Sequence, residues 1–155
     1  TSQFLWTLQL DSDHLIIRVS GPFFDDPPAP NTAPGPTPAL WEHEVAELFI
    51  AGPGQQYLEV ELGPHGHHLM IALDGVRTPV QDLLPMVYEA HIEGDRWTGL
   101  ARVSRALIPK GPNRIGAFAI HGSGTQRRYL SMTRLPGETP DFHQLAHLQP
   151  IVLPE

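Results

Sequence analysis

The stretch that decides the fold is residues 41–73, which reads WEHEVAELFIAGPGQQYLEVELGPHGHHLMIAL. Apolar residues occupy every second position of its first two runs, namely Ala46, Leu48 and Ile50, then Leu58, Val60 and Leu62. This period of two is typical of half-buried β-strands. The glycine-containing turn between the runs therefore predicts a hairpin with one apolar face.

The opposite face of this hairpin concentrates acidic and aromatic side chains. The same alternation places five residues on it: Glu47, Phe49, Tyr57, Glu59 and Glu61. Like charges on neighbouring strands repel one another. This amount of negative charge in a small area is therefore unusual. We expect these acids to face an open, solvated groove that contacts a ligand.

Similar alternations recur along the chain at a spacing of roughly 8 to 12 residues. They predict a hairpin over 4–19, a third central strand over 69–73, a hairpin over 87–103, and strands over 115–121, 129–133 and 148–153. Residues 79–85 are expected to be irregular, and 104–108 to form a helical turn capped by Ser104. The fold class predicted is all-β: an antiparallel sandwich of the jelly-roll type with about ten short strands.

Prolines dominate residues 21–40, where they occupy positions 22, 27, 28, 30, 34, 36 and 38. Proline fixes the backbone and lacks an amide donor, so a long loop is predicted that is either a binding edge or disordered. The loop is too short to link domains. The 155 residues are expected to form a single domain over 1–155.

Composition excludes several classes of protein. The formal charge of −7 argues against a nucleic-acid partner, and the absence of cysteine excludes disulfides and thiolate metal sites. No apolar run approaches the roughly 20 residues that cross a bilayer, so no membrane partner is expected. A cytoplasmic location is expected, although the missing initial Met is also compatible with a removed leader. Composition does not indicate the oligomeric state.

The histidines around the second turn do not predict a metal site. His67 and His68 point to opposite faces of an extended segment, and His65 lies in the turn, so the three would not converge on one ion. An exposed polar turn is the preferred interpretation, and no metal-binding residue is assigned.

Two sets of residues suggest a hydrolase as an alternative. Glu59 and Glu61 project from one face of a strand at roughly 7 Å, within the range for an inverting glycosidase. His121, Asp141 and His143 would form an acid–base group if their segments met. Because no serine elbow or cysteine nucleophile accompanies them, a non-catalytic protein is favoured.

Several motifs resemble known families. The run LWEHEVAELFI at 40–50, followed by YLEVELGPHG at 57–66, resembles the signature of family 9 carbohydrate-binding modules. FAIHGSGTQRRYLSM at 118–132 and PDFHQLAHLQP at 140–150 are similar to closing segments of the uncharacterised UPF0462 proteins within that superfamily. The resemblance implies a jelly-roll sandwich with a sugar-binding surface and, as in many such modules, structural calcium. Other cofactors are not expected.

In the characterised modules two tryptophans clamp a terminal sugar. Trp41 and Glu47 match the motif region, whereas the resemblance leaves Trp97 as a structural residue. The predicted function is therefore non-catalytic binding of a saccharide or similar polyol; a hydrolase and a protein-interaction module using the proline loop or a strand edge are the alternatives. The expected ligand-binding residues are Trp41, Glu47, Tyr57, Glu59, Glu61, His121, Tyr129 and His143.

Overall fold

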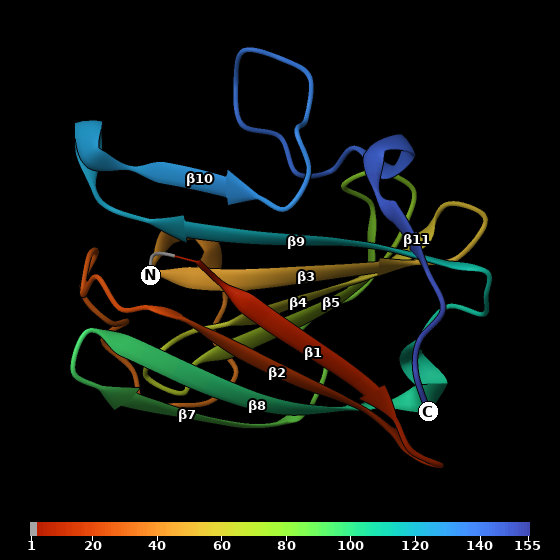
Figure 1. The fold of residues 1–155 in the computed structure, drawn as a ribbon, viewed down its shortest axis with the longest axis horizontal. Coiled ribbons are helices and arrows are strands. Elements are labelled where there is room, and N and C mark those ends of the chain that lie inside the picture. The colour runs from red at the N-terminus through yellow and green to blue at the C-terminus, as the bar shows by residue number, and fades with distance from the viewer. Residues whose placement is uncertain (1–2) are drawn as a thin grey trace.

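The computed structural model describes residues 3–155 as two antiparallel β-sheets that pack face to face (Figure 1). The smaller sheet has four strands in the order β1-β2-β8-β7. Their bounds are β1 (Leu5–Leu10), β2 (His14–Pro22), β7 (Val87–Glu93) and β8 (Arg96–Ser104).

The larger sheet has seven strands, and its central path runs β10-β9-β3-β4-β5-β6. Their bounds are β3 (Val45–Ala51), β4 (Gln56–Leu62), β5 (His68–Asp74), β6 (Pro79–Gln81), β9 (Asn113–His121), β10 (Arg128–Ser131) and β11 (Gln149–Ile151). Strands β10 and β11 both pair with the edge of β9 that β3 leaves free. The hairpin β3–β4 therefore lies at the centre of this sheet.

Helical structure in residues 3–155 is limited to single 3-10 turns. They are η1 (Leu40–Glu42), η2 (Arg105–Leu107), η3 (Gly124–Gln126) and η4 (Leu145–His147). None of the helices in this described part of the chain has the length and apolar character that crossing a membrane requires.

The sequence-based fold class is confirmed, with local corrections. Residues 79–85 were expected to be irregular, but β6 forms there and adds an edge strand beside β5. Strand β2 continues to Pro22, which pairs with Arg96, so the proline-rich loop starts after that residue rather than at 21. The predicted turn after Ser104 forms as η2, but the Ser104 side chain does not cap it. The turn is closed by a backbone hydrogen bond from the N–H of Ile108 to the carbonyl oxygen of Arg105.

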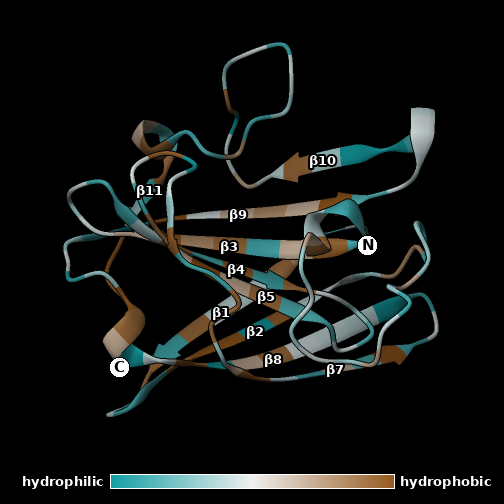
Figure 2. Cartoon of the chain, turned by 180° about the vertical axis from the view of Figure 1, so that it is seen from behind, coloured by the Kyte–Doolittle hydropathy of each residue, from teal (hydrophilic) through white to brown (hydrophobic). Residues whose placement is uncertain are grey.

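The apolar face of the central hairpin packs between the two sheets, as its alternation predicts. Leu48 and Val60 are completely buried there, and Trp97 from β8 is 1% exposed on the facing sheet. Figure 2 shows hydrophobic segments on strands of both sheets. Trp97 is therefore a core residue.

We predict that Trp97→Ala lowers the free energy of unfolding by about 3–5 kcal/mol, because it removes a large buried side chain and leaves a cavity. Val87→Ala is the control: Val87 is 68% exposed on the edge strand β7 and should change stability by less than about 1 kcal/mol. Urea unfolding followed by tryptophan fluorescence and circular dichroism measures both. Equal effects would contradict the placement of Trp97 in the core.

Candidate functional site

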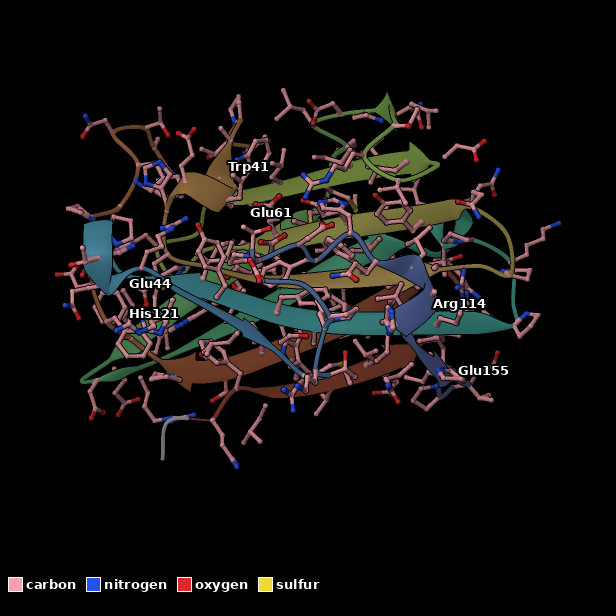
Figure 3. All side chains as sticks on the ribbon, turned by 90° about the horizontal axis from the view of Figure 1, so that it is seen from above. Trp41, Glu44, Glu61, Arg114, His121 and Glu155 are labelled. Carbon is pink, nitrogen blue, oxygen red and sulfur yellow. The ribbon has the colours of Figure 1, made fainter. Side chains whose placement is uncertain are left out.

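The outer face of the seven-stranded sheet is buried by two covering segments, residues 36–44 and 132–148. Leu40 from the first, and Leu145 and Leu148 from the second, pack on apolar side chains of the strands. Together they form an outer cluster of Leu40, Val45, Phe49, Ala51, Tyr57, Leu69, Ile71, Leu73, Phe118, Ile120, Leu145 and Leu148. Figure 3, seen from above, shows the blue C-terminal segment crossing over these strands.

Polar contacts fix the covering segments at opposite ends of the sheet. At one end the buried Glu44 carboxylate accepts hydrogen bonds from the backbone N–H groups of Phe24 (2.9 Å) and Asp26 (3.1 Å). At the other, Arg114 donates to the carbonyl oxygens of Leu145 (2.9 Å) and Gly52 (2.7 Å). Glu44 and Arg114 are labelled at these two ends in Figure 3.

The proline-rich loop is also tied to the fold. The His67 ring meets the carbonyl oxygen of Thr32 at 2.8 Å, and Pro36 forms a parallel bridge with His68. Burial lowers the pKa of His68 and raises that of Glu44, although the two backbone N–H groups partly offset the latter effect. The loop is therefore packed against the fold, and its role as a binding edge stays a prediction.

A cavity of about 330 Å³ opens between the covering segments and the sheet. Its exposed aromatic rings are Trp41, 44% exposed, and Tyr129, 45% exposed. The lining residues are Trp41, Glu47, Glu59, Ile71, Leu73, Arg77, Pro79, Ile120, Tyr129, Pro140, Phe142 and His143. Ligand sites in proteins are commonly concave, largely apolar pockets of this size with a few polar groups.

Three glutamates, here called the acidic cluster, lie together on this face of the sheet: Glu47 and Glu59 line the base of the cavity, and Glu61 lies behind them. Glu47 pairs with Glu61 across the β3–β4 ladder, and one carboxylate oxygen of each of the three lies within 4.8 Å of the others. Their exposed fractions are 3%, 4% and 0%. The expectation of a solvated, open acidic face was therefore wrong, because the covering segments bury it.

Burial has a clear electrostatic consequence for the acidic cluster. Removal from water raises the pKa of Glu47 and of Glu61 well above the ordinary value, and repulsion from neighbouring glutamates adds to this effect. Arg127 opposes the rise at Glu47, but less strongly. Glu47 and Glu61 therefore hold protons more tightly than exposed carboxylates do.

His143 reaches the acidic cluster from the second covering segment. Its Nδ1 lies 2.7 Å from the Tyr57 hydroxyl, and its Nε2 lies 3.7 Å from Oε1 of Glu59. Burial lowers the pKa of the His143 imidazole, although Glu59 opposes the change. The imidazole therefore favours its neutral form at the side of the cavity.

Arg77 lines the cavity, although sequence reasoning did not single it out. It has a left-handed backbone (φ 54°), its N–H donates to the Tyr57 hydroxyl (3.1 Å), and its guanidinium bonds Asp141 at 2.8 Å. Burial tends to raise the pKa of Asp141, but the bonds from Arg77 and from the His143 backbone outweigh it and leave the pKa lowered. A non-glycine residue with positive φ is uncommon. The sequence around Arg77 therefore does not predict this backbone conformation or the contacts that depend on it.

Arg127 links the two exposed aromatic residues. Its guanidinium donates to the Trp41 carbonyl oxygen (2.5 Å) and to that of Gly122 (3.2 Å), and lies over the Tyr129 ring, 5.5 Å from its centroid. The residue thus positions Tyr129 against the segment that carries Trp41. Arg127 lies in the motif at 118–132. The neighbouring residues in that motif do not indicate that Arg127 contacts Trp41 and Tyr129.

Most of the predicted site residues come together in space. Five of the eight line the cavity: Trp41, Glu47, Glu59, Tyr129 and His143. Tyr57 and Glu61 lie behind that lining, and contact it through His143 and through the other glutamates. His121 does not belong to this group, because its ring stacks on Phe24 at 3.7 Å near one end of the sheet.

Neither predicted hydrolase set is assembled by these contacts. The Asp141 carboxylate accepts a hydrogen bond from the backbone N–H of His143 rather than from its ring, and His121 packs elsewhere. Glu59 and Glu61 do share a face, but Glu61 is fully buried and does not line the cavity. A carboxyl pair that flanks a scissile bond needs both groups in contact with substrate.

Comparison with known proteins identifies the family. The chain is 42% identical to the UPF0462 protein C4orf33 homolog of Danio rerio, over 91% of this chain and 76% of that protein. It is 38% identical to the human UPF0462 protein C4orf33, over 87% of this chain and 72% of that protein. The chain belongs to the UPF0462 family. No family model matches it.

Solved structures of similar fold are carbohydrate-binding proteins. A provisionally assigned carbohydrate-binding protein of Bacteroides uniformis superposes with a TM-score of 0.76 at 12% identity, over 95% of this chain and 76% of that one. A family 9 carbohydrate-binding module of Caldicellulosiruptor kristjanssonii in complex with cellotriose gives 0.54 at 14% identity, over 85% and 67%. The predicted β-sandwich fold is thus confirmed. The structural calcium that the resemblance implies stays a prediction.

We predict that Glu61→Gln becomes more stable relative to the wild type as pH rises. Unfolded Glu61 ionises near pH 4.5, whereas the folded pKa is higher, so the wild type loses stability as pH rises between those values. Glutamine does not titrate, so the difference should grow by at most about 1.4 kcal/mol per pH unit. Urea unfolding at about pH 5 and about pH 8, in EDTA, measures it.

Glu89→Gln is the control for this experiment, because Glu89 is exposed on β7. The stability difference between Glu61→Gln and the wild type should change more between the two pH values than the difference for Glu89→Gln does, because Glu61 is buried. If the free energy of unfolding of Glu61→Gln changes with pH in the same way as that of the wild type, Glu61 is not a buried carboxyl group without a partner.

Proposed function

We propose that this UPF0462 protein is a non-catalytic binding protein for a saccharide or a similar polyol, with the ligand seated in the cavity between the covering segments. The observation that carries the proposal is the combination of two exposed aromatic rings with carboxylates at the base of one cavity. Sugars need both kinds of contact. Their C–H faces stack on aromatic rings, while their hydroxyl groups donate to carboxylates.

Trp41 supplies the main stacking surface in this proposal. It sits in η1 at the rim of the cavity, and almost half of its surface is exposed. An exposed tryptophan in a pocket is costly to leave in water, so covering it with a sugar ring contributes favourably to binding. Tyr129 offers a second exposed ring at the same cavity.

The polar side of the cavity provides hydrogen bonds of both kinds. Glu47 and Glu59 accept from hydroxyl groups, and the guanidinium of Arg77 is a donor at the same lining. The similar fold of carbohydrate-binding proteins supports the ligand class, and glucose and cellotriose are the ligands named for the family 9 module. These two sugars are therefore the natural first probes.

The protein-interaction alternative is less well supported. It relied on a free proline-rich loop or an open strand edge, whereas the loop is held by Glu44, His67 and the bridge at Pro36. A well-formed cavity with convergent polar groups is a feature of small-ligand sites rather than of peptide-binding edges.

We expect at least one neutral sugar to bind more tightly than about 1 mM, which corresponds to about 4 kcal/mol. A glycan array followed by titration calorimetry, starting with glucose and cellotriose, measures this with the 155-residue chain. Trp41→Ala should weaken binding at least tenfold, about 1.4 kcal/mol, because it removes the stacking surface.

The control is Val87→Ala on the opposite sheet, which should bind as the wild type does. Circular dichroism establishes that both variants are folded. If no sugar binds below the millimolar range, or if Trp41→Ala binds as well as the control, the proposed site is wrong.

A further inference from the structure

The acidic cluster poses an electrostatic problem that sugar binding does not solve. Three carboxyl groups lie together with exposed fractions of 4% or less, and burying ionised carboxylates without a partner of opposite charge is very unfavourable. We propose that Glu47, Glu59 and Glu61 bind a divalent metal cation. This proposal does not depend on the saccharide proposal.

The positions of the oxygen atoms suit a single cation. Divalent cations hold carboxylate oxygens at about 2.0–2.6 Å, so two ligands of one ion lie at most about 5 Å apart. One oxygen from each of the three glutamates meets this limit, because all lie within 4.8 Å of one another. The ladder pairing of Glu47 with Glu61 fixes this spacing through the backbone.

Glu61 gives independent evidence that the cluster lacks a partner. Its side chain is completely buried, and neither carboxylate oxygen receives a hydrogen bond from an N–H or hydroxyl group of residues 3–155. Buried polar groups normally have partners. A divalent cation held by one carboxylate oxygen of each glutamate would give Glu61 a partner and reduce the repulsion among the three groups.

The nearby arginines form their hydrogen bonds elsewhere. Arg77 bonds the Asp141 carboxylate, and Arg127 donates to backbone carbonyl oxygens, including that of Trp41. Neither therefore forms an ion pair with a carboxylate of the acidic cluster. Arg127 acts on Glu47 only weakly, because desolvation and repulsion from Glu59 outweigh its effect.

His143 lies beside the cluster and contacts Glu59. Its Nδ1 lies 2.7 Å from the Tyr57 hydroxyl, and its Nε2 lies 3.7 Å from Oε1 of Glu59, so the ring holds Glu59 at the side of the cavity. Carboxylate ligands favour hard ions, so Mn²⁺ is the first candidate, ahead of Zn²⁺. The cavity gives either ion a route from solvent.

The test uses the chelator-treated chain and the metal salts alone. Thermal unfolding is measured with MnCl₂, ZnCl₂, CaCl₂ or MgCl₂ added, and Mn²⁺ binding is measured directly by calorimetry. At an ion concentration about 100-fold above Kd, Mn²⁺ or Zn²⁺ should raise Tm by roughly 5 to 10 °C.

Glu61→Gln and Glu47→Gln keep the side-chain shape and should abolish this rise in Tm, whereas Glu89→Gln should retain it. If both cluster variants fold but the wild type gains no more Tm than they do with any of the four ions, and calorimetry detects no Mn²⁺ binding, the site does not exist. Sugar titration with and without Mn²⁺ separates this outcome from failure of the saccharide proposal.

Discussion

Burial of the outer face of the seven-stranded sheet is the constraint on which the site depends. Strands β3, β4 and β5 carry large apolar residues on both faces, including Phe49 and Ile71, so this face cannot remain in water at low cost. Residues 36–44 and 132–148 cover it. The glutamates that alternate with the core-facing residues of β3 and β4 are covered as well, which gives a charged cluster in an apolar surrounding.

The same covering segments create the cavity and supply its walls. Trp41 belongs to the first covering segment and His143 to the second, and strands β3 and β4 contribute Glu47 and Glu59 to the lining. Aromatic rings at the rim and ionisable groups at the base then give the site two separate capacities. The rim suits the apolar face of a sugar, and the base suits a positive charge or shared protons.

The sequence predicts the strands and the two faces of the central hairpin, because alternation with period two is a local property. It did not predict burial of Glu47, Glu59 and Glu61, because that depends on residues far along the chain. Tyr57 and His143, for example, are 86 positions apart. The covering segments have no periodicity, and neither the positive φ of Arg77 nor the displacement of His121 to Phe24 leaves a sequence signal.

The central claim is that the acidic cluster is buried without a compensating charge. The most direct measurement is a pH titration of the glutamate side-chain carboxyl groups by ¹³C NMR, on the metal-free chain. The account predicts that the resonances of Glu47 and Glu61 titrate well above the ordinary value of 4.5, because both carboxyl groups are buried. If all glutamates titrate independently near 4.5, the cluster is solvated and the account is wrong.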